Sequence, residues 1–232
     1  MIIGFVGLIG AGKDTAADYL VNFYGFRRDS FANTLKDAVS NVFGWDRTLL
    51  EGRTKEAREW REQVDTWWAD RLEIPKLTPR WILQYWGTDV CRKAFHDDIW
   101  IASLENKMRK TKDNIVISDV RFPNEITAIH NAGGIVIRVK RGDDPEWFDA
   151  AVSANKGPIG NSTWSLSRLK LEKLGIHASE TSWVGGDIDY TVWNNASIDD
   201  LFAQLKNLVE DHLVANEYLL SVESSDSLHI QS

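Results

Sequence analysis

A glycine-rich stretch near the N-terminus constrains this chain more than any other feature. Residues 7–15 read GLIGAGKDT and directly follow the apolar segment IIGFV at residues 2–6. Gly7, Gly12 and Lys13 fit the G-x-x-x-x-G-K frame of a phosphate-binding loop, in which backbone N–H groups curl around a phosphate. A glycine-rich turn without a ligand is the weaker alternative, because the frame lies between the first predicted strand and the first predicted helix. The predicted nucleotide-binding residues are Gly10, Ala11, Gly12, Lys13, Asp14 and Thr15.

Asp14 departs from the common form of this loop, where a serine or threonine hydroxyl reaches the magnesium ion. A carboxylate is also a hard oxygen ligand that Mg²⁺ accepts readily. We therefore expect Asp14 to serve the metal, directly or through a water, while Thr15 remains available to the α-phosphate. The alternative is that Asp14 only caps the helix, since aspartate is favoured at that position.

Composition predicts a globular protein with no membrane partner. The chain has 232 residues, of which 43% are hydrophobic and 26% charged, and it contains no long apolar run or secretory leader. Cys91 is the single cysteine, which excludes an internal disulfide and favours the cytoplasm. The net charge of −7 argues against stable binding of nucleic acid.

Apolar periodicity predicts an alternation of strands and helices along the chain. Strands are expected at residues 2–6, 114–120, 135–139 and 189–194. Helices are expected at residues 13–24, 30–44, 54–72, 78–95, 97–110, 123–134 and after Ser197. Residues 141–187 are expected to be rich in loops. The alternation indicates an α/β fold with a mainly parallel sheet covered on both faces.

The length of the chain favours a small-acceptor kinase among proteins with a phosphate-binding loop. No Asn-Lys-x-Asp sequence that would read guanine follows a strand, and a motor would need a longer chain. Lys36, Arg53, Arg58 and Arg61 are candidates for binding a phosphorylated acceptor, because arginine can hold a phosphate bidentately. For each of them alone, a solvated helical residue is the stronger explanation.

Two further stretches carry residues suited to nucleotide chemistry. Trp100 is the tryptophan we prefer as a stacking plane for a base, because acidic residues flank it, although most tryptophans here are expected in the core. Gln84 could read a base edge. In ISDVRFPNE, Asp119 ends a buried strand where an acid would organise magnesium, and Arg121 could reach the transferred phosphate. A turn with a surface arginine is the alternative.

Together these stretches resemble the deoxynucleoside monophosphate kinases of tailed bacteriophages. The likeness rests on GAGKDTAADYL, FANTLKDAV, LEGRTKEAREWRE, LTPRWILQYWGTDVCRKAFHDDIW, ISDVRFPNEI, GIHASE and NNASIDDL. It implies a three-layer P-loop kinase fold in one domain over residues 1–216, with a helical acceptor-binding region at about 45–110 and a lid at about 141–180. Residues 217–232 would form a polar tail.

The resemblance also implies the reaction. ATP with Mg²⁺ would donate its γ-phosphoryl group to a dNMP, such as dGMP, dTMP or 5-modified dCMP, to give a dNDP for phage DNA synthesis in the host-cell cytoplasm. Two alternatives stay open: dephospho-coenzyme A kinase or another small-acceptor P-loop kinase, and an ATP-binding phage assembly protein that transfers no phosphate. The sequence does not decide base preference or oligomeric state, and it leaves room for a homodimer.

Position by position, the resemblance assigns roles to particular residues. It implies catalytic roles for Lys13, Arg58 and Arg121, and metal binding by Asp14 and Asp119. The implied dNMP-binding residues are Lys36, Arg58, Gln84, Gly87, Thr88, Trp100, Asp119, Arg121, Glu125, His177, Ser179 and Glu180.

Overall fold

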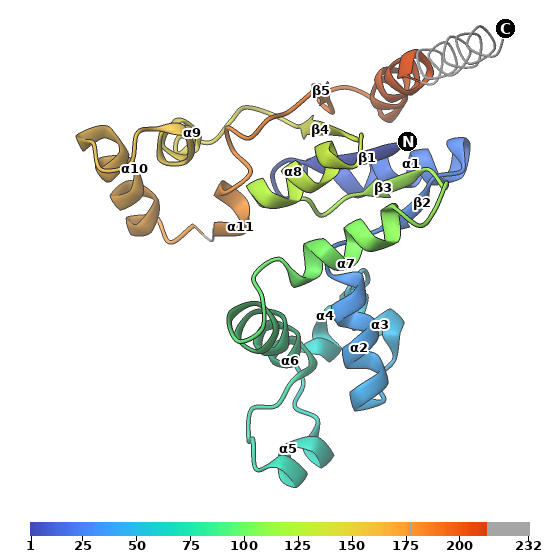
Figure 1. Ribbon diagram of the computed structural model, residues 1–232, viewed down its shortest axis with the longest axis vertical. Helices are drawn as coiled ribbons and strands as arrows, with labels where there is room; N and C mark the ends of the chain where they lie inside the picture. The colour runs from blue at the N-terminus through green and yellow to red at the C-terminus, as the bar shows by residue number, and fades with distance from the viewer. Residues whose placement is uncertain (177, 213–232) are drawn as a thin grey trace, which may run out of the picture.

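A five-stranded parallel sheet forms the centre of the protein. The computed structural model describes residues 1–176 and 178–212. The strands are β1 (Ile2–Val6), β2 (Arg27–Asp29), β3 (Ile115–Ile117), β4 (Ile135–Lys140) and β5 (Tyr190–Trp193), in the spatial order β2-β3-β1-β4-β5. Every neighbouring pair is parallel, so the carboxyl ends of all strands lie along one edge (Figure 1). Loops that follow different strands therefore meet at that edge.

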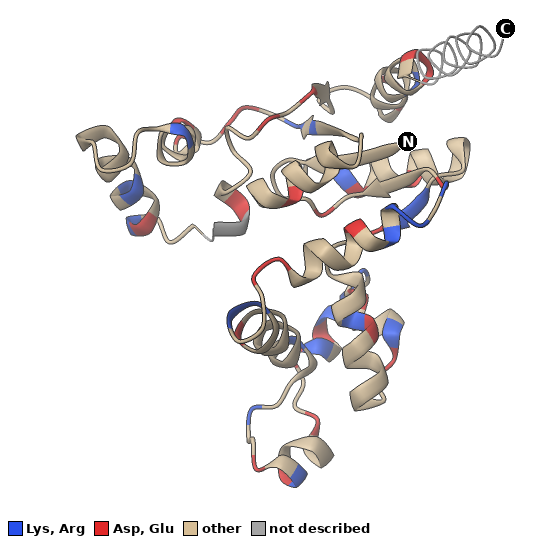
Figure 2. Ribbon diagram, viewed as in Figure 1, with Lys and Arg blue, Asp and Glu red and all other residues tan. Residues whose placement is uncertain are grey.

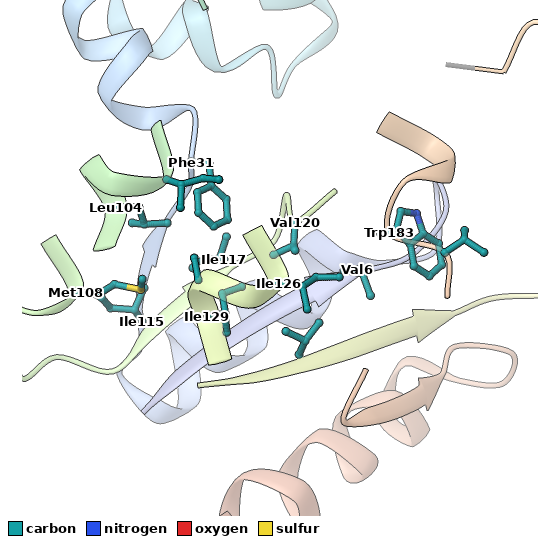
Figure 3. Packing of buried hydrophobic residues seen from close by; sticks show 14 of the residues in the cluster. Val6, Phe31, Leu104, Met108, Ile115, Ile117, Val120, Ile126, Ile129 and Trp183 are labelled. Carbon is teal, nitrogen blue, oxygen red and sulfur yellow. The ribbon is translucent and has the colours of Figure 1, made fainter. Parts of the chain in front are cut away.

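Helices cover both faces of this sheet, because the central strands are apolar on both sides. Ile3 and Phe5 of β1 pack with α1 (Lys13–Tyr24) and with the helix at residues 198–212. Ile115 and Ile117 of β3 point to the opposite face, where α7 (Ile99–Met108) and α8 (Pro123–Asn131) lie (Figure 3). The expected three-layer α/β arrangement is thus confirmed.

A helical region extends away from the sheet below β2 and β3 in the view of Figure 1. Its elements are α2 (Asn33–Phe43), α3 (Arg47–Glu51), α4 (Lys55–Arg61), α5 (Thr66–Leu72), α6 (Pro79–Gln84) and the π-helix η1 (Tyr85–Lys93). This region has its own apolar cluster, built from Leu35, Val39, Phe43, Trp45, Leu50, Ala69, Leu77, Ile82 and Trp100. Its core is therefore separate from the two clusters on the faces of the sheet.

Two helices in this region differ from the sequence-based expectation. The single helix expected at 54–72 is replaced by two helices, α4 and α5. Asp65 caps the second helix, α5, by accepting a hydrogen bond from the N–H of Trp68 (3.1 Å). The single α-helix expected at 78–95 changes to a π-helix after Gln84. Periodicity cannot separate these forms, since both bury one apolar stripe.

Residues 141–187 are largely helical, which corrects the expectation of a loop-rich stretch. They contain α9 (Phe148–Lys156), α10 (Ser162–Lys173) and α11 (Ala178–Thr181). Asn161 caps α10 by accepting a hydrogen bond from the N–H of Trp164 (2.7 Å). The glycines between these short helices led the sequence analysis to predict loops. The short elements β2 and α3 were likewise absent from the expected set.

Other boundaries agree closely with expectation. Helix α1 covers residues 13–24 as predicted, and Ser197 Oγ accepts a hydrogen bond from the N–H of Asp200 (3.2 Å) at the start of the last helix. None of the helices in the described ranges combines the length and apolar character that crossing a membrane requires. The predicted tail at 217–232 lies outside the described residues.

Candidate active site at the carboxyl edge of the sheet

The loop between β1 and α1 needs glycine for two separate steric reasons. Gly7 has φ +143°, and a Cβ there would lie 2.4 Å from the carbonyl oxygen of Val139 on β4. Gly12 has φ +105°, and a Cβ there would lie 2.5 Å from Nδ2 of Asn194. The loop is thus pressed against the ends of β4 and β5, with backbone conformations that other residues rarely adopt.

Asn194 also holds the loop directly. Its Nδ2 donates a hydrogen bond to the carbonyl oxygen of Ala11 (2.9 Å) across 183 positions of sequence. Sequence reasoning missed this residue. Its only local signal is a polar side chain directly after a short strand.

Lys13 supplies the positive charge of the loop. Its Nζ donates hydrogen bonds to the carbonyl oxygens of Gly7 (2.7 Å) and Leu8 (2.9 Å). Burial, followed by the positive charge of Arg121, lowers the pKa of Lys13, while the acidic Glu180, Asp14 and Asp119 act in the opposite direction. Four charged groups from three segments, α1, the turn after β3 and α11, therefore act on this ammonium group.

Asp14 does not cap helix α1, so that alternative is wrong. The N-cap residue is Gly12, and no side chain caps this end of the helix. The Asp14 carboxylate instead accepts hydrogen bonds from Arg28 of β2 and from Ser118 Oγ (2.9 Å), while 81% of its side chain stays exposed.

Ser118 and Asp119 are the two residues that follow the end of β3. Burial raises the pKa of Asp119, and a hydrogen bond with Ser30 and the charges of Lys36 and Arg121 partly oppose that rise. Among the described residues, its Oδ1 is buried and has no hydrogen-bond partner. A buried carboxylate oxygen in this condition is suited to bind a cation or a polar ligand group.

The acidic residues fit a metal that arrives with phosphate groups better than a metal held by protein alone. Within the described ranges, no three histidine, cysteine or acidic side chains gather closely enough to hold an ion. Asp14 and Asp119 nevertheless both lie close enough to Lys13 for their negative charges to raise its pKa. Magnesium in nucleotide sites uses one or two carboxylates and keeps waters or phosphate oxygens as its other ligands, so these residues fit it.

Arg121 connects the turn after β3 to helix α11. Its Nη1 lies 3.7 Å from Oε1 of Glu180. Glu125, at the start of α8, accepts hydrogen bonds at Oε2 from the N–H groups of Arg121 (2.7 Å) and Phe122 (3.1 Å). Glu125 is only 4% exposed, and its hydrogen bonds hold the backbone that carries Arg121. The direct acceptor contact that the resemblance implies stays a prediction.

Arg92 of η1 reaches the same turn and was missed by sequence reasoning. Its Nη2 lies 3.9 Å from Oε1 of Glu125, and its guanidinium lies 5.7 Å from the centre of the Phe122 ring. The helical region is thereby joined to the segment that carries Arg121. No motif signals this contact, because the residues are about thirty positions apart.

Two of the expected acceptor-binding cations gather around the end of α3. Lys36 Nζ donates a hydrogen bond to Oε2 of Glu51 (2.7 Å). Arg58 donates to the carbonyl oxygens of Gly52 (3.3 Å) and Arg53 (3.0 Å) and remains exposed. In Figure 2 positive and negative segments lie side by side along α2, α3 and α4. Arg61 is instead packed against Gly52, where a Cβ would lie 2.1 Å from its Nη2.

Trp100 is not an open stacking plane, which corrects the expectation drawn from its polar flanks. It is 9% exposed within the cluster of the helical region, and its Nε1 donates a hydrogen bond to the carbonyl oxygen of Gly87 (2.9 Å). Gln84 and Thr88 are exposed on either side of the buried Gly87. Trp100 thus holds the segment that carries them. His177 lies outside the described residues, and the side chain of Ser179 is not described.

A glycine loop after β1, a lysine over it and acids after β3 define an α/β phosphotransferase of the P-loop class. Comparison with known proteins narrows this class. The family model for deoxynucleotide monophosphate kinase matches residues 59–157. An assigned deoxynucleotide monophosphate kinase of Acanthamoeba polyphaga mimivirus is 35% identical over 155 residues, covering 61% of this chain and 74% of the relative. The chain therefore belongs to the deoxynucleotide monophosphate kinase family.

Two further comparisons accompany this result. The deoxynucleoside-5'-monophosphate kinase of Escherichia phage T5 is 28% identical over 174 residues, covering 54% of this chain and 70% of the relative. Among solved structures, shikimate kinase from Aquifex aeolicus overlays with a TM-score of 0.44 at 12% identity, covering 92% of this chain and 99% of that one.

Proposed function

We propose that this chain transfers the γ-phosphoryl group of ATP to the 5'-phosphate of a deoxynucleoside monophosphate. The bond from the γ-phosphorus to the bridging oxygen breaks, and a bond from the γ-phosphorus to an acceptor phosphate oxygen forms. The products are ADP and a deoxynucleoside diphosphate. Membership of the deoxynucleotide monophosphate kinase family supports this reaction.

The observation that carries the proposal is the meeting of three parts of the chain around Asp119 and Lys13. The loop contributes Lys13, the helical region contributes Lys36, and α11 contributes Glu180 through its ion pair with Arg121. A phosphotransferase has to bring donor, acceptor and a cover together at one place and keep water out. The carboxyl edge of this sheet is where these parts meet.

The residues act by placement and by charge. An acceptor phosphate with its second pKa near 6 is mostly dianionic at neutral pH, so its oxygen needs no general base. Lys13 and Arg121 offset negative charge that develops on the transferred group, and Glu125 holds the Arg121 backbone. Mg²⁺ carried in with ATP, next to Asp14 and Asp119, would supply further charge neutralisation on the phosphate oxygens.

On the acceptor side, Lys36 and Arg58 are the cations we assign to the dNMP phosphate. Gln84 and Thr88, exposed beside Gly87 on α6 and η1, are the polar groups we assign to the nucleoside. We place the reaction in the cytoplasm of an infected cell, in support of viral DNA synthesis, on the strength of the viral and phage relatives.

An acceptor panel tests this assignment. ADP release is measured with dAMP, dGMP, dCMP, dTMP, their ribose counterparts and dephospho-coenzyme A, each with MgATP. We expect ADP formation that depends on at least one dNMP. Phosphorylation of dephospho-coenzyme A alone would transfer the assignment to that kinase, and ATP binding without transfer to any acceptor would support the assembly protein.

A further inference from the structure

Arg28 of β2 is a half-buried cation that the proposed reaction has not yet used. Its Nη1 donates to Oδ1 of Asp18 (2.6 Å), and its Nη2 donates to Oδ1 of Asp14 and to Oγ of Ser118 (2.6 Å). Its side chain is 17% exposed, whereas those of Asp14 and Asp18 are 81% and 59% exposed. One guanidinium therefore joins the loop helix α1 to the end of β3.

The two carboxylate oxygens of Asp14 differ in their hydrogen bonding. Oδ1 accepts from Arg28 and from Ser118, whose Oγ lies 2.9 Å away. Among the described residues, Oδ2 has no hydrogen-bond partner and belongs to a largely exposed carboxylate. One oxygen is thus anchored while the other is available at the metal end of the loop.

Resting on the proposed function, we infer that Arg28 is a positioning residue that acts through Asp14. It fixes the Asp14 carboxylate by Oδ1, leaves Oδ2 for a hydrated divalent cation, and offsets the negative charge that Asp14 places beside the ATP phosphates. This account explains how a carboxylate can stand where the common loop has a neutral hydroxyl. Without a fixed cation, an aspartate there would repel any nucleotide that arrives without metal.

The inference predicts a specific linkage between nucleotide and magnesium. In Arg28→Met the guanidinium is lost while an unbranched aliphatic side chain is kept. The variant should fold, because Asp14 and Asp18 are exposed enough for water to solvate them. Metal-free ATP should then bind about tenfold more weakly than to the wild type, whereas MgATP should bind within about threefold of it.

The neighbouring residue offers a matched control. Arg27 lies on the same strand, is 49% exposed, and pairs with Asp29 (3.8 Å) and Asp113 (3.7 Å) instead of with the loop helix. Arg27→Met removes the same charge from the protein and so reports the effect of net charge alone. We expect its affinities for ATP with and without Mg²⁺ to stay within about twofold of the wild type.

Calorimetric titration of the full chain with ATP, in EDTA and in excess Mg²⁺, measures the ratio of the two affinities for each variant. In the double variant Arg28→Met with Asp14→Asn, metal-free binding should recover to within about threefold of the wild type, because the uncompensated charge is gone. An equal loss with and without Mg²⁺ in Arg28→Met, or no recovery in the double variant, would overturn the inference.

Two further measurements separate the possible failures. If Arg28→Met does not fold, Asp14→Asn alone is decisive. Arg28 then keeps the carboxylate of Asp18 but no longer faces the negative charge of Asp14, so metal-free ATP should bind more tightly. An unchanged ratio would overturn the inference. Failure of the wild type to bind ATP under either condition would instead remove the proposed kinase function.

Discussion

At the scale of single residues, Lys13 is the side chain whose loss should affect chemistry most directly. Its Nζ donates hydrogen bonds to the carbonyl oxygens of Gly7 and Leu8, and these oxygens can bond water after its removal. We expect Lys13→Ala to lower kcat by roughly a hundredfold or more, because a preorganised charge at the transferred group is lost. A coupled ADP assay measures kcat, and circular dichroism checks the fold.

Lys112→Ala, on an exposed turn before β3, is the matched control and should leave kcat unchanged. A folded Lys13→Ala protein with nearly normal kcat would contradict the assignment of the loop to phosphoryl transfer.

Trp100 is a second residue with a sharp expectation, now derived from its burial. Trp100→Phe keeps an aromatic ring but removes the hydrogen bond from Nε1 to the carbonyl oxygen of Gly87. Unfolding in urea should show that the free energy of unfolding falls by about 0.5–1.5 kcal/mol. The acceptor KM should rise more than the ATP KM, because Gly87 precedes the exposed Thr88. Trp67→Phe, at a site 63% exposed, is the control.

Equal changes in both KM values for Trp100→Phe would show that the helical region does not specifically serve the acceptor. Trp100→Ala is a poorer test, since emptying a buried tryptophan site costs about 3–5 kcal/mol and so threatens folding.

At the scale of elements, the junction between β3 and α8 depends on one buried carboxylate. Burial raises the pKa of Glu125 to about 7, against an ordinary value of 4.5, despite the hydrogen bonds from the N–H groups of Arg121 and Phe122. Between those two values the folded chain keeps a proton that the unfolded chain has released. The free energy of unfolding should therefore fall as the pH rises through this window.

Glu125→Gln removes this titration and provides the comparison. Urea unfolding at pH 5 and pH 7.5 should show the wild type losing about 1–3 kcal/mol relative to Glu125→Gln over this interval. Glu59→Gln on the surface of α4 is the control. Parallel stability curves for the wild type and Glu125→Gln would show that Glu125 is not protonated in the folded chain near neutrality.

The π-helix η1 is another element whose form matters for the site. It places Gly87 against Leu35, where a Cβ on Gly87 would lie 2.8 Å from Cδ2 of Leu35, and it brings Arg92 to Glu125. A helix of this rare kind often marks a functional position. Here it lets one segment contact the α2 core, the Trp100 indole and the Arg121 turn.

At the scale of the whole molecule, the pair of Arg121 and Glu180 joins the central sheet to the α9–α11 region (Figure 1). The two side chains are 47% and 21% exposed, so their attraction should contribute at most about 1 kcal/mol to stability. We expect Glu180→Gln to shift the Tm by no more than about 4 °C. We also expect kcat to fall by roughly tenfold, because the charge of Glu180 no longer helps to position the Arg121 guanidinium.

Thermal unfolding and the coupled ADP assay measure these two effects. Glu172→Gln, an exposed glutamate on α10, should change neither. A large drop in Tm with unchanged kcat would make the pair a purely structural contact and remove α11 from the active site.

The sequence by itself determined the features that depend on near neighbours in the chain. The strand at 2–6, the glycine loop and helix α1 follow from apolar periodicity and from the fixed spacing of Gly7, Gly12 and Lys13. The last helix could be predicted in the same way, from the Ser197 cap and the apolar periodicity that follows it. Strand alternation also predicted a parallel sheet with two covered faces. These properties need no knowledge of contacts between distant segments.

Only the tertiary structure decided which distant residues complete the site. Asp14 meets Arg28 and Ser118, the latter 104 positions away, and Trp100 turns from an apparent surface plane into a buried support for Gly87. Strand β2, with three residues, is too short for periodicity to reveal, yet pairing with β3 places Arg28 beside the loop. Burial and pairing between remote segments are set by packing of the whole chain, so local patterns cannot assign them.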